Sequence, residues 1–337
     1  MIENRKLEHL KICVEKNVAS HYNYWDDIIL KHESIPRVDL DEISLTTEFL
    51  GRKLEAPIIV DAMTGGHKIA KKINENIARV CESLGIGMAV GSQRAAIEKK
   101  ELETTYSVIK NFDLPLRLGN IGAPQIALGY GEEELKIAME MIDAHALEIH
   151  FNYLQESVQP EGDTKVRGLK EKLTLLARKF PLIAKETGAG ISRNAGEFFK
   201  ESGFKAIDVS GVSGTSFAAV EYFREGELGR TFWDWGLPSP YVILSLRDLE
   251  IPLIGSGGIR NGVDAAKALA LGANVVGIAR EILPQAMKSH RDVERKLEKI
   301  IKELKIAIFL SGATNIEELR NVEYIIRGEL RSWLKLS

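Results

Sequence analysis

Cysteine is scarce in this sequence, and its scarcity excludes two kinds of site. Cys13 and Cys81 are the two cysteines among 337 residues, so no disulfide framework can stabilise the chain. Neither cysteine lies at the spacing of a metal site. This usage fits a reducing compartment, and we expect a cytoplasmic protein.

A surplus of charge of one sign is also missing. The 45 Lys and Arg residues nearly balance the 48 Asp and Glu residues, which gives a net charge of −3 at pH 7. This balance provides no electrostatic reason to expect binding to nucleic acid or to an anionic membrane. A small anionic substrate stays compatible with it, because its site needs only a few local cations.

Long apolar runs are absent as well. No stretch approaches the roughly 18 apolar residues that span a membrane. The charges of residues 1–6 are not followed by the apolar core of a signal peptide. We therefore expect no membrane partner. The amphipathic stretch 315–335 is predicted to form a surface helix that packs on the domain.

Short apolar runs are what the chain does have, and four of the eight end in Asn or Ser. They lack strict polar alternation, which is typical of strands buried on both faces of a parallel sheet. Stretches with a helical apolar period separate them, and this alternation of strand and helix predicts an α/β fold. Eight units favour closure into a (β/α)₈ TIM barrel. The predicted strands are 56–62, 85–90, 114–120, 146–152, 182–186, 206–210, 253–256 and 274–279, and the clearest helices are 68–84, 132–144, 169–179, 192–202 and 261–271.

One domain is expected over residues 1–337. Its barrel would occupy residues 56–312, between an N-terminal helical extension over 1–55 and a C-terminal helix over 313–337.

Within the extension, residues 5–17 and 24–31 are predicted helices, and the rest would cover the barrel bottom or contact a neighbour. The connections 153–168 and 211–238 are unusually long. Long loops after the strands are where a barrel keeps its chemistry, so the second connection is a candidate lid.

A phosphate site is predicted after the last two strands. Residues 255–262 read GSGGIRNG and open a helix, while residues 277–280 read GIAR. Glycines let the backbone approach a phosphate closely, and the free N–H groups of a helix start bind the anion. The loops after the seventh and eighth strands of a barrel often grip phosphate in this way.

The other strand ends suit a flavin ring. Residues 62–65 offer small side chains and backbone groups to the ring, and Ser92 and Asn120 offer partners for its pyrimidine atoms. Lys185 lies on the fifth strand, and a lysine in the barrel mouth is costly to bury without an anionic partner. Beside a flavin it would stabilise the negative charge of the reduced ring. Ser210 and Thr215 are candidates for the ribityl or phosphate oxygens.

In this combination the sequence resembles the type 2 isopentenyl diphosphate isomerases, a flavin-dependent family. The motif after the fourth strand and the N-terminal Arg-Lys pair are the specific features, whereas the phosphate loops are shared with other FMN barrels. The matching motifs are residues 4–9 (NRKLEH), 63–66 (MTGG), 91–94 (GSQR), 150–156 (HFNYLQE), 159–162 (QPEG), 185–186 (KE), 210–215 (SGVSGT) and 255–260 (GSGGIR).

The resemblance implies an isomerase of isoprenoid biosynthesis that interconverts isopentenyl and dimethylallyl diphosphate. It implies FMN that must be reduced, NADPH as the reductant, Mg²⁺, and a homotetramer or homo-octamer. The net reaction is a redox-neutral 1,3-proton shift, for which a reduced flavin can act as acid, base and charge stabiliser.

The resemblance also assigns residues to roles. Gln155, His150 and Asn152 would serve catalysis, and Glu156 would bind Mg²⁺. The substrate contacts would be Arg5, Lys6, Ser92, Gln93, Arg94 and Gln155, with His9 as a further candidate cation. The flavin contacts would be Ala62, Met63, Thr64, Gly65, Ser92, Asn120, Lys185, Ser210, Thr215, Gly258, Ile259, Arg260, Ala279 and Arg280.

Three alternatives remain open at this point. An FMN-dependent 2-hydroxy-acid oxidoreductase would place His and Arg after the late strands, but the next histidine there is His290. An enzyme of the IMP dehydrogenase type would need a cysteine at a strand end, where neither Cys13 nor Cys81 lies. A non-enzymatic binding protein would stay colourless when FMN is added.

Overall fold

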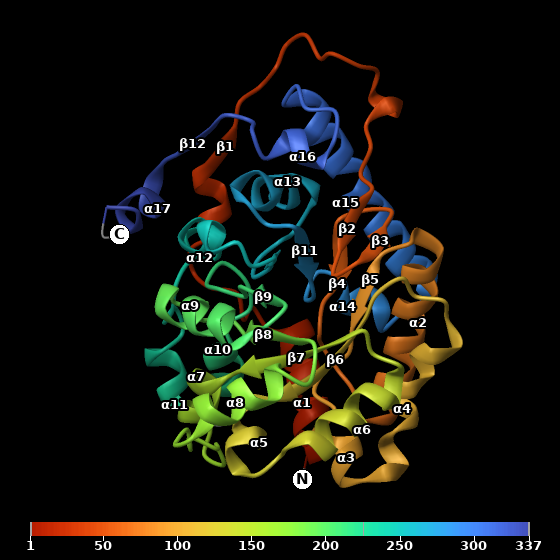
Figure 1. The fold of residues 1–337 in the computed structure, drawn as a ribbon, viewed down its shortest axis with the longest axis vertical. Helices are drawn as coiled ribbons and strands as arrows, with labels where there is room; N and C mark the ends of the chain where they lie inside the picture. Colours follow the sequence, from red (N-terminus) through yellow and green to blue (C-terminus); the bar gives the residue numbers. More distant parts are fainter. Residues whose placement is uncertain (1, 225, 336–337) are drawn as a thin grey trace.

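Eight parallel strands close into a barrel in the computed structural model, which describes every residue except 1, 225, 336 and 337 (Figure 1). The order around the barrel is β10-β11-β4-β5-β6-β7-β8-β9. Each predicted strand run contains or overlaps one barrel strand, so the TIM-barrel prediction is confirmed. The strands are β4 (Ile58–Val60), β5 (Gly87–Ala89), β6 (Arg117–Gly122), β7 (Ala146–Phe151), β8 (Leu182–Glu186), β9 (Ala206–Asp208), β10 (Leu253–Gly255) and β11 (Val275–Ile278).

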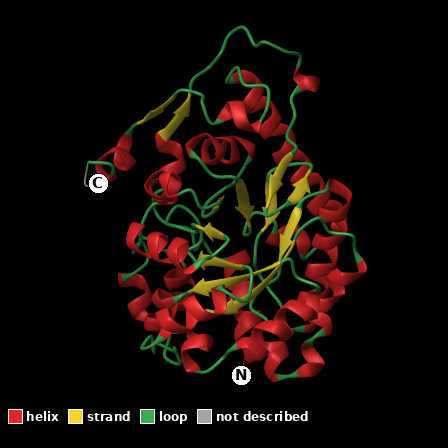
Figure 2. Ribbon diagram, in the orientation of Figure 1, coloured by secondary structure: helices red, strands yellow, loops and turns green. Residues whose placement is uncertain are grey.

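Helices surround the strands, as Figure 2 shows in red around yellow. The longest of the predicted ones, α2 (Lys68–Leu84), has its predicted bounds because His67 caps the amide of Ile69 and Gly85 ends the helix in a left-handed conformation. The remaining outer helices are α3 (Arg94–Glu98), α4 (Thr104–Ser107), α5 (Ala123–Leu128), α6 (Glu132–Ile142), α8 (Leu169–Ala177), α9 (Arg193–Ser202), α12 (Ser239–Leu246), α13 (Gly262–Leu271), α14 (Leu283–Ala286) and α15 (His290–Leu310).

Part of the N-terminal extension covers the bottom of the barrel, which is one of the two arrangements that we expected. Strands β2 (Thr47–Phe49) and β3 (Arg52–Leu54) form a hairpin. Phe49 and Leu54 pack with barrel-interior side chains such as Ile183 in one buried cluster. The opposite end of the barrel is thus the end left for chemistry.

Two predicted helices are wrong. Residues 24–31 form a short 3₁₀ turn, Tyr24–Asp27, and then β1 (Ile28–Leu30). The C-terminal helix over 313–337 is instead α16 (Ile316–Leu319), β12 (Tyr324–Ile326) and α17 (Gly328–Trp333), and its last two residues lie outside the described part.

Pairing between the two ends of the chain explains both errors. Strands β1 and β12 form an antiparallel ribbon in which Ile28 faces Ile326. The Asp27 carboxylate accepts a hydrogen bond of 2.9 Å from the Leu330 amide and starts α17. Helical periodicity is a local signal, and here a contact across some 300 residues of sequence overrides it.

Three segments gather at the barrel mouth. The two long connections contain α7 (Tyr153–Val158) and the pair α10 (Phe217–Arg224) and α11 (Glu227–Thr231). Helix α1 (Ile2–Glu15) packs against α10, and α10 packs against α7. The N-terminus therefore returns to the loops that follow β7 and β9. Among the helices described, we find none with the length and apolar character needed to cross a membrane.

Candidate active site

Lys185 is the centre of a buried charged cluster in the barrel. Its ammonium donates to Asp61 Oδ2 at 2.7 Å and to Asp208 Oδ2 at 2.6 Å. Burial alone would lower the pKa of Lys185, but the carboxylates of Asp208, Asp61 and Glu148 outweigh it and raise that pKa. The lysine is thus charged, as expected, and its partners in the absence of a ligand are aspartates. We call Asp61, Glu148, Lys185 and Asp208 the Lys185 cluster.

Hydroxyl groups tie this cluster to the predicted phosphate loop. Ser210 Oγ donates to Asp208 Oδ1 at 3.0 Å, and the Ser256 hydroxyl donates to the same oxygen. Ser256 Oγ also accepts the Ser210 amide at 2.9 Å. The end of β9 and the start of the glycine-rich loop after β10 are therefore fixed around one carboxylate.

A hydrogen-bonded chain leads from the cluster to His150. Asn120 Nδ2 donates to Glu148 Oε2 at 2.8 Å, which leaves Asn120 Oδ1 to accept from His150 Nδ1 at 2.8 Å. This arrangement assigns the proton of the neutral ring to Nδ1 and leaves Nε2 as an acceptor. Burial, together with the charges of Lys185 and Lys6, lowers the pKa of His150 to about 3.

A neutral His150 makes stability depend on pH in a definite direction. The unfolded chain binds a proton at His150 below about pH 6.5, whereas the folded protein does so only near pH 3. Stability should therefore fall as the pH drops from about 6.5, by up to about 1.4 kcal/mol per pH unit from this residue. His150→Gln should flatten the decline of the melting temperature measured between pH 7 and 5. His32→Gln, at an exposed histidine, should leave it unchanged, and equal slopes for all three proteins would contradict the assignment.

The motif after β7 folds into a second buried cluster. Glu156 Oε1 accepts from Asn152 Nδ2 at 2.8 Å, and Oε2 accepts from Gln159 Nε2 at 2.5 Å and from the Asp163 amide at 2.7 Å. In the part of the chain that the structure describes, the buried oxygens Asn152 Oδ1 and Gln159 Oε1 have no hydrogen-bond partner. A carboxylate beside unpartnered amide oxygens is the donor set that Mg²⁺ prefers. We call Asn152, Glu156 and Gln159 the Glu156 cluster.

Gln155, in the first turn of α7 and next to Glu156, is held by a residue that the sequence analysis did not identify. Its Nε2 donates at 2.7 Å to Glu221 Oε1 on α10, and His9 Nε2 lies 2.9 Å from the same oxygen. Arg224 donates to Glu221 Oε2 at 2.7 Å. Burial would raise the pKa of Glu221, but His9, Gln155 and Arg224 lower it, so it stays a carboxylate. An acidic residue inside an otherwise apolar helix face was the available signal.

The expected cations lie where α1 meets the barrel mouth. Lys6 Nζ donates at 2.7 Å both to the Ser92 carbonyl and to the Tyr106 hydroxyl. Burial, then the charges of Arg5 and Arg94, lower the pKa of Lys6 to about 7. Arg94 is 28% exposed and bonds Glu98 at 2.7 Å. The charges of Arg5 and Arg94 act on Lys6, and these two arginines also pair with Glu161 at 3.8 Å and with Asp163 at 3.5 Å.

The glycine-rich loop after β10 is shaped by its neighbours as well as by any ligand. Gly257 and Gly258 have φ angles of +84° and +91°, and a Cβ on Gly258 would lie 2.3 Å from the Ser213 carbonyl oxygen. The glycines are therefore required for this loop to pack on the one after β9. We find no hydrogen bond from the Gly258 or Ile259 amide to any described residue, so both remain available to a phosphate.

Two arginines at this site are engaged elsewhere. Arg260 forms ion pairs with Asp264 at 2.8 Å and with Asp26 at 2.7 Å. Arg280 donates to backbone carbonyls of α1 and the residues after it, at 3.3 Å to Cys13 and 3.1 Å to Lys16. Both guanidinium groups are thus engaged within the protein, and the Arg260 amide also donates to Asp264 Oδ2 at 3.2 Å. Arg260 and Arg280 stay predictions as flavin contacts.

The segment after β4 has features that suit a bound ligand. One predicted substrate contact on the neighbouring loop after β5 does not. Thr64 Oγ1 is buried without a hydrogen-bond partner among described residues, and a Cβ on Gly65 would overlap the Tyr106 ring. Gln93 is the exception. Its side chain is fully buried, donates to Ala138 O at 2.8 Å and accepts the Asn120 amide at 2.9 Å, so it cannot reach a substrate. Ala62, Met63, Ser92 and Ala279 lie at or just after the strand ends, whereas Thr215 lies farther along the loop after β9 and forms a bridge with Ala19.

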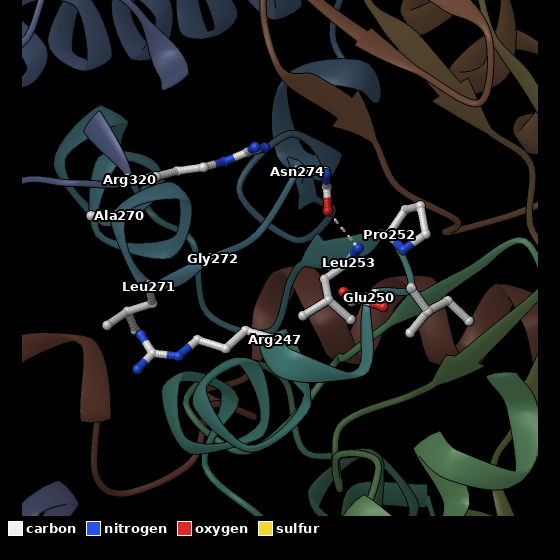
Figure 3. Close-up of a pocket in the computed structure, with 10 residues that line it drawn as sticks. Arg247, Glu250, Pro252, Leu253, Ala270, Leu271, Gly272, Asn274 and Arg320 are labelled. Carbon is white, nitrogen blue, oxygen red and sulfur yellow. Dashed lines mark hydrogen bonds between the residues drawn. The ribbon is translucent and has the colours of Figure 1, made fainter. Parts of the chain in front are cut away.

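The pocket drawn in Figure 3 is not this site. It measures about 440 Å³ and includes Arg247, Arg320 and Asn274, whose Oδ1 accepts the Leu253 amide at 2.9 Å. Leu253 begins β10, so the pocket lies at the N-terminal ends of the strands. In TIM-barrel enzymes the active site lies at the opposite end, where the C-terminal ends of the strands are.

Relatives of known sequence match the whole chain. Isopentenyl-diphosphate delta-isomerase from Thermoplasma acidophilum is 46% identical, with 99% of each chain covered. The protein of the same name from Thermococcus onnurineus is 46% identical over 98% of this chain and 93% of its own length. That from Sulfurisphaera tokodaii is 44% identical over 99% and 94%.

Structural neighbours agree on the barrel fold. A mandelate oxidase mutant with a monooxide FMN adduct has a TM-score of 0.65 at 13% identity, with 94% of this chain and 95% of that chain covered. A flavocytochrome b2 mutant with sulfite bound has a TM-score of 0.67 at 17% identity, over 93% and 81%. At such identity these neighbours show the fold alone.

Residues 240–326, which include the glycine-rich loop and β11, match the profile of the FMN-dependent dehydrogenases. This match covers about a quarter of the chain and concerns the predicted phosphate loops. Identity of 44–46% over the full length is decisive for the rest. The chain belongs to the isopentenyl-diphosphate delta-isomerase family, in its flavin-dependent type 2 form.

Proposed function

We propose that this protein interconverts isopentenyl diphosphate and dimethylallyl diphosphate, with reduced FMN and Mg²⁺ bound at the barrel mouth. The observation that carries the proposal is 46% identity over 99% of both chains to a relative of that name. The two buried clusters at the mouth support it, because each offers what one of the two cofactors requires.

FMN fits the residues at the strand ends. The amides of Gly258 and Ile259, with the backbone of residues 279–280, would hold the phosphate. The segment 62–65 and Lys185 would face the ring, and the unpartnered Thr64 hydroxyl is a donor or acceptor in reach of a ligand there. Reduced FMN supplies an acid–base group and charge stabilisation that no side chain offers to an alkene. NADPH is the proposed reductant.

Mg²⁺ fits the Glu156 cluster. Glu156 would bind the ion, with Asn152 Oδ1 and Gln159 Oε1 next to it, and diphosphate oxygens and waters would complete the shell. The other candidate for a metal site is the set of carboxylates of Asp61, Glu148 and Asp208, whose oxygens lie within 4.8 Å of one another. This set does not fit a metal, because the Lys185 ammonium already lies between two of these carboxylates.

The residues around α7 would position and accept protons at the substrate. Glu221 holds the Gln155 amide at 2.7 Å, so Gln155 presents a fixed orientation to the alkene. Neutral His150 offers Nε2 as an acceptor on the same side of the barrel. Arg5, Lys6 and Arg94 would neutralise the diphosphate as α1 closes against α10. A homotetramer or homo-octamer and a cytoplasmic location complete the proposal and rest on the resemblance.

Lys6→Ala should raise the Michaelis constant for isopentenyl diphosphate at least about tenfold, while FMN affinity stays unchanged. One lost charge-assisted contact to phosphate accounts for about 1.5–3 kcal/mol. Because the pKa of Lys6 is lowered to about 7, the wild-type Michaelis constant should rise above pH 7, and the variant should lack this rise. Steady-state kinetics between pH 6 and 9 measure both, with the exposed Lys71→Ala as control. Loss of flavin from Lys6→Ala would contradict the assignment.

A visible spectrum tests the cofactor half of the proposal. Purified protein mixed with FMN and freed of excess nucleotide should stay yellow, and it should bleach when NADPH is added without oxygen. Colourless protein after this treatment would favour a non-enzymatic role. Oxygen consumption with lactate or glycolate would favour a 2-hydroxy-acid oxidase, the alternative from the same fold.

A further inference from the structure

The Lys185 cluster holds more negative than positive charge. One ammonium lies among three carboxylates, and two of them contact it at 2.6 and 2.7 Å. The side chains of Asp61, Lys185 and Asp208 are only 6%, 6% and 0% exposed. The positive charge of Lys185 is therefore compensated inside the protein before any ligand binds.

This compensation matters for the flavin that the proposed function places against Lys185. Two-electron reduction with one proton gives the reduced anion, whereas reduction with two protons gives the neutral ring. An uncompensated buried ammonium would favour the anion, since a nearby opposite charge stabilises the charged form. A ring that must give a proton to an alkene needs the second proton.

We propose that Asp61 offsets the charge of Lys185 at the flavin, and so keeps the reduced ring protonated and lowers the reduction potential of the bound cofactor. The inference rests on the proposed function for the presence of FMN. Asp61 acts through Lys185 and is therefore a positioning and charge-setting residue.

Asp61 is better suited to this role than the other two acids. Asp208 also accepts the hydroxyls of Ser210 and Ser256, so it fixes two loops. Burial raises the pKa of Glu148 well above its usual value, although Lys185 acts in the opposite direction, and its hydrogen bond goes to Asn120 and not to the ammonium. Asp61 uses its second oxygen for the amide of Ala62, at 2.7 Å.

A glycine on the neighbouring strand leaves space for the Asp61 carboxylate. A Cβ on Gly277 of β11 would lie 3.0 Å from Asp61 Oδ2, which is tighter than ordinary contact. The charge of Lys185 also acts on His150 of β7, which is neutral above about pH 3 and adds no charge to the cluster.

Potentiometric titration of the FMN holoenzyme with dithionite tests the proposal. Asp61→Asn should favour reduced over oxidised flavin at least tenfold, which raises the two-electron midpoint potential by about 30 mV or more. The midpoint of the wild type should fall by about 59 mV per pH unit near pH 7, as two protons per two electrons require. That of the variant should fall by about 30 mV per unit, because its reduced ring binds one proton.

Matched variants separate charge from structure. Asp61→Ser removes the same charge with a smaller side chain and serves if Asp61→Asn does not fold. Asp61→Glu keeps the charge and should titrate like the wild type. Asp248→Asn, at a surface carboxylate 62% exposed beside Arg193, should change nothing. Unchanged potential and slope in a neutral Asp61 variant that retains FMN would overturn this inference, whereas wild-type protein unable to bind FMN would overturn the proposed function instead.

Discussion

Glu156→Gln is expected to lower kcat/KM for isopentenyl diphosphate by about a thousandfold or more, equivalent to roughly 4 kcal/mol of transition-state stabilisation. The substitution keeps the size of the side chain and an oxygen that can accept from Asn152 Nδ2. It removes the one carboxylate of the Glu156 cluster, and a neutral amide is a much weaker ligand for a hard divalent cation. FMN affinity should not change, because the predicted flavin contacts lie on or after other strands.

Titration of activity against Mg²⁺ distinguishes this role from a structural one. The variant should need far more Mg²⁺, or fail to saturate, when it is assayed well below its melting temperature, which should fall because the new amide nitrogen faces the Gln159 and Asp163 N–H groups. Glu171→Gln, at an exposed carboxylate on α8, is the matched control and should behave like the wild type. A Glu156→Gln enzyme with normal activity at ordinary Mg²⁺ would show that the carboxylate does not hold the metal.

Lys185→Met should produce the largest loss of stability among single substitutions at the mouth. It leaves Asp61 and Asp208 buried next to each other without a cation, and breaking a buried ion pair from one side costs about 3–5 kcal/mol. The loss should shrink below about pH 6, because burial raises the pKa of Asp208 to about 6 and the absence of the ammonium raises it further. FMN should bind weakly or not at all.

Denaturant unfolding at pH 7.5 and at pH 5 measures this effect, together with flavin fluorescence after gel filtration. Lys205→Met, at an exposed lysine just before β9, controls for the loss of a positive charge. Adding Asp61→Asn to Lys185→Met should recover part of the stability, since one of the two unpaired carboxylates is gone. A single variant as stable as the wild type, with FMN bound, would refute the central position of Lys185.

Elements of the fold were predicted correctly wherever the sequence signal for them was local. Helix α2 was predicted to the residue because its period, cap and terminal glycine act within 18 residues of one another. The β1–β12 ribbon was missed because Ile28 and Ile326 pair across almost the whole chain. A short run of β-branched residues beside a helical pattern gives no indication of such a distant partner.

The sequence predicted which side chains form the site better than it predicted the partners of these side chains. Lys185, His150 and Glu156 were identified as functional side chains, and the structure places all three in buried clusters at the mouth. The partners of Lys185 and Gln155 were missed, because Asp61 and Glu221 reach these two side chains from other segments of the chain. Arg260 stays a predicted flavin contact, and its ion pairs to Asp26 and Asp264 were not predicted.

Product formation per reductant consumed tests the central claim most directly. Holoenzyme with FMN, Mg²⁺ and a trace of NADPH, kept free of oxygen, should convert isopentenyl diphosphate to an equilibrium mixture with dimethylallyl diphosphate over many turnovers per NADPH oxidised. The two diphosphates are distinguished by NMR. One NADPH consumed for each product molecule, or no dimethylallyl diphosphate from protein that is yellow with FMN and bleached by NADPH, would contradict a redox-neutral isomerase.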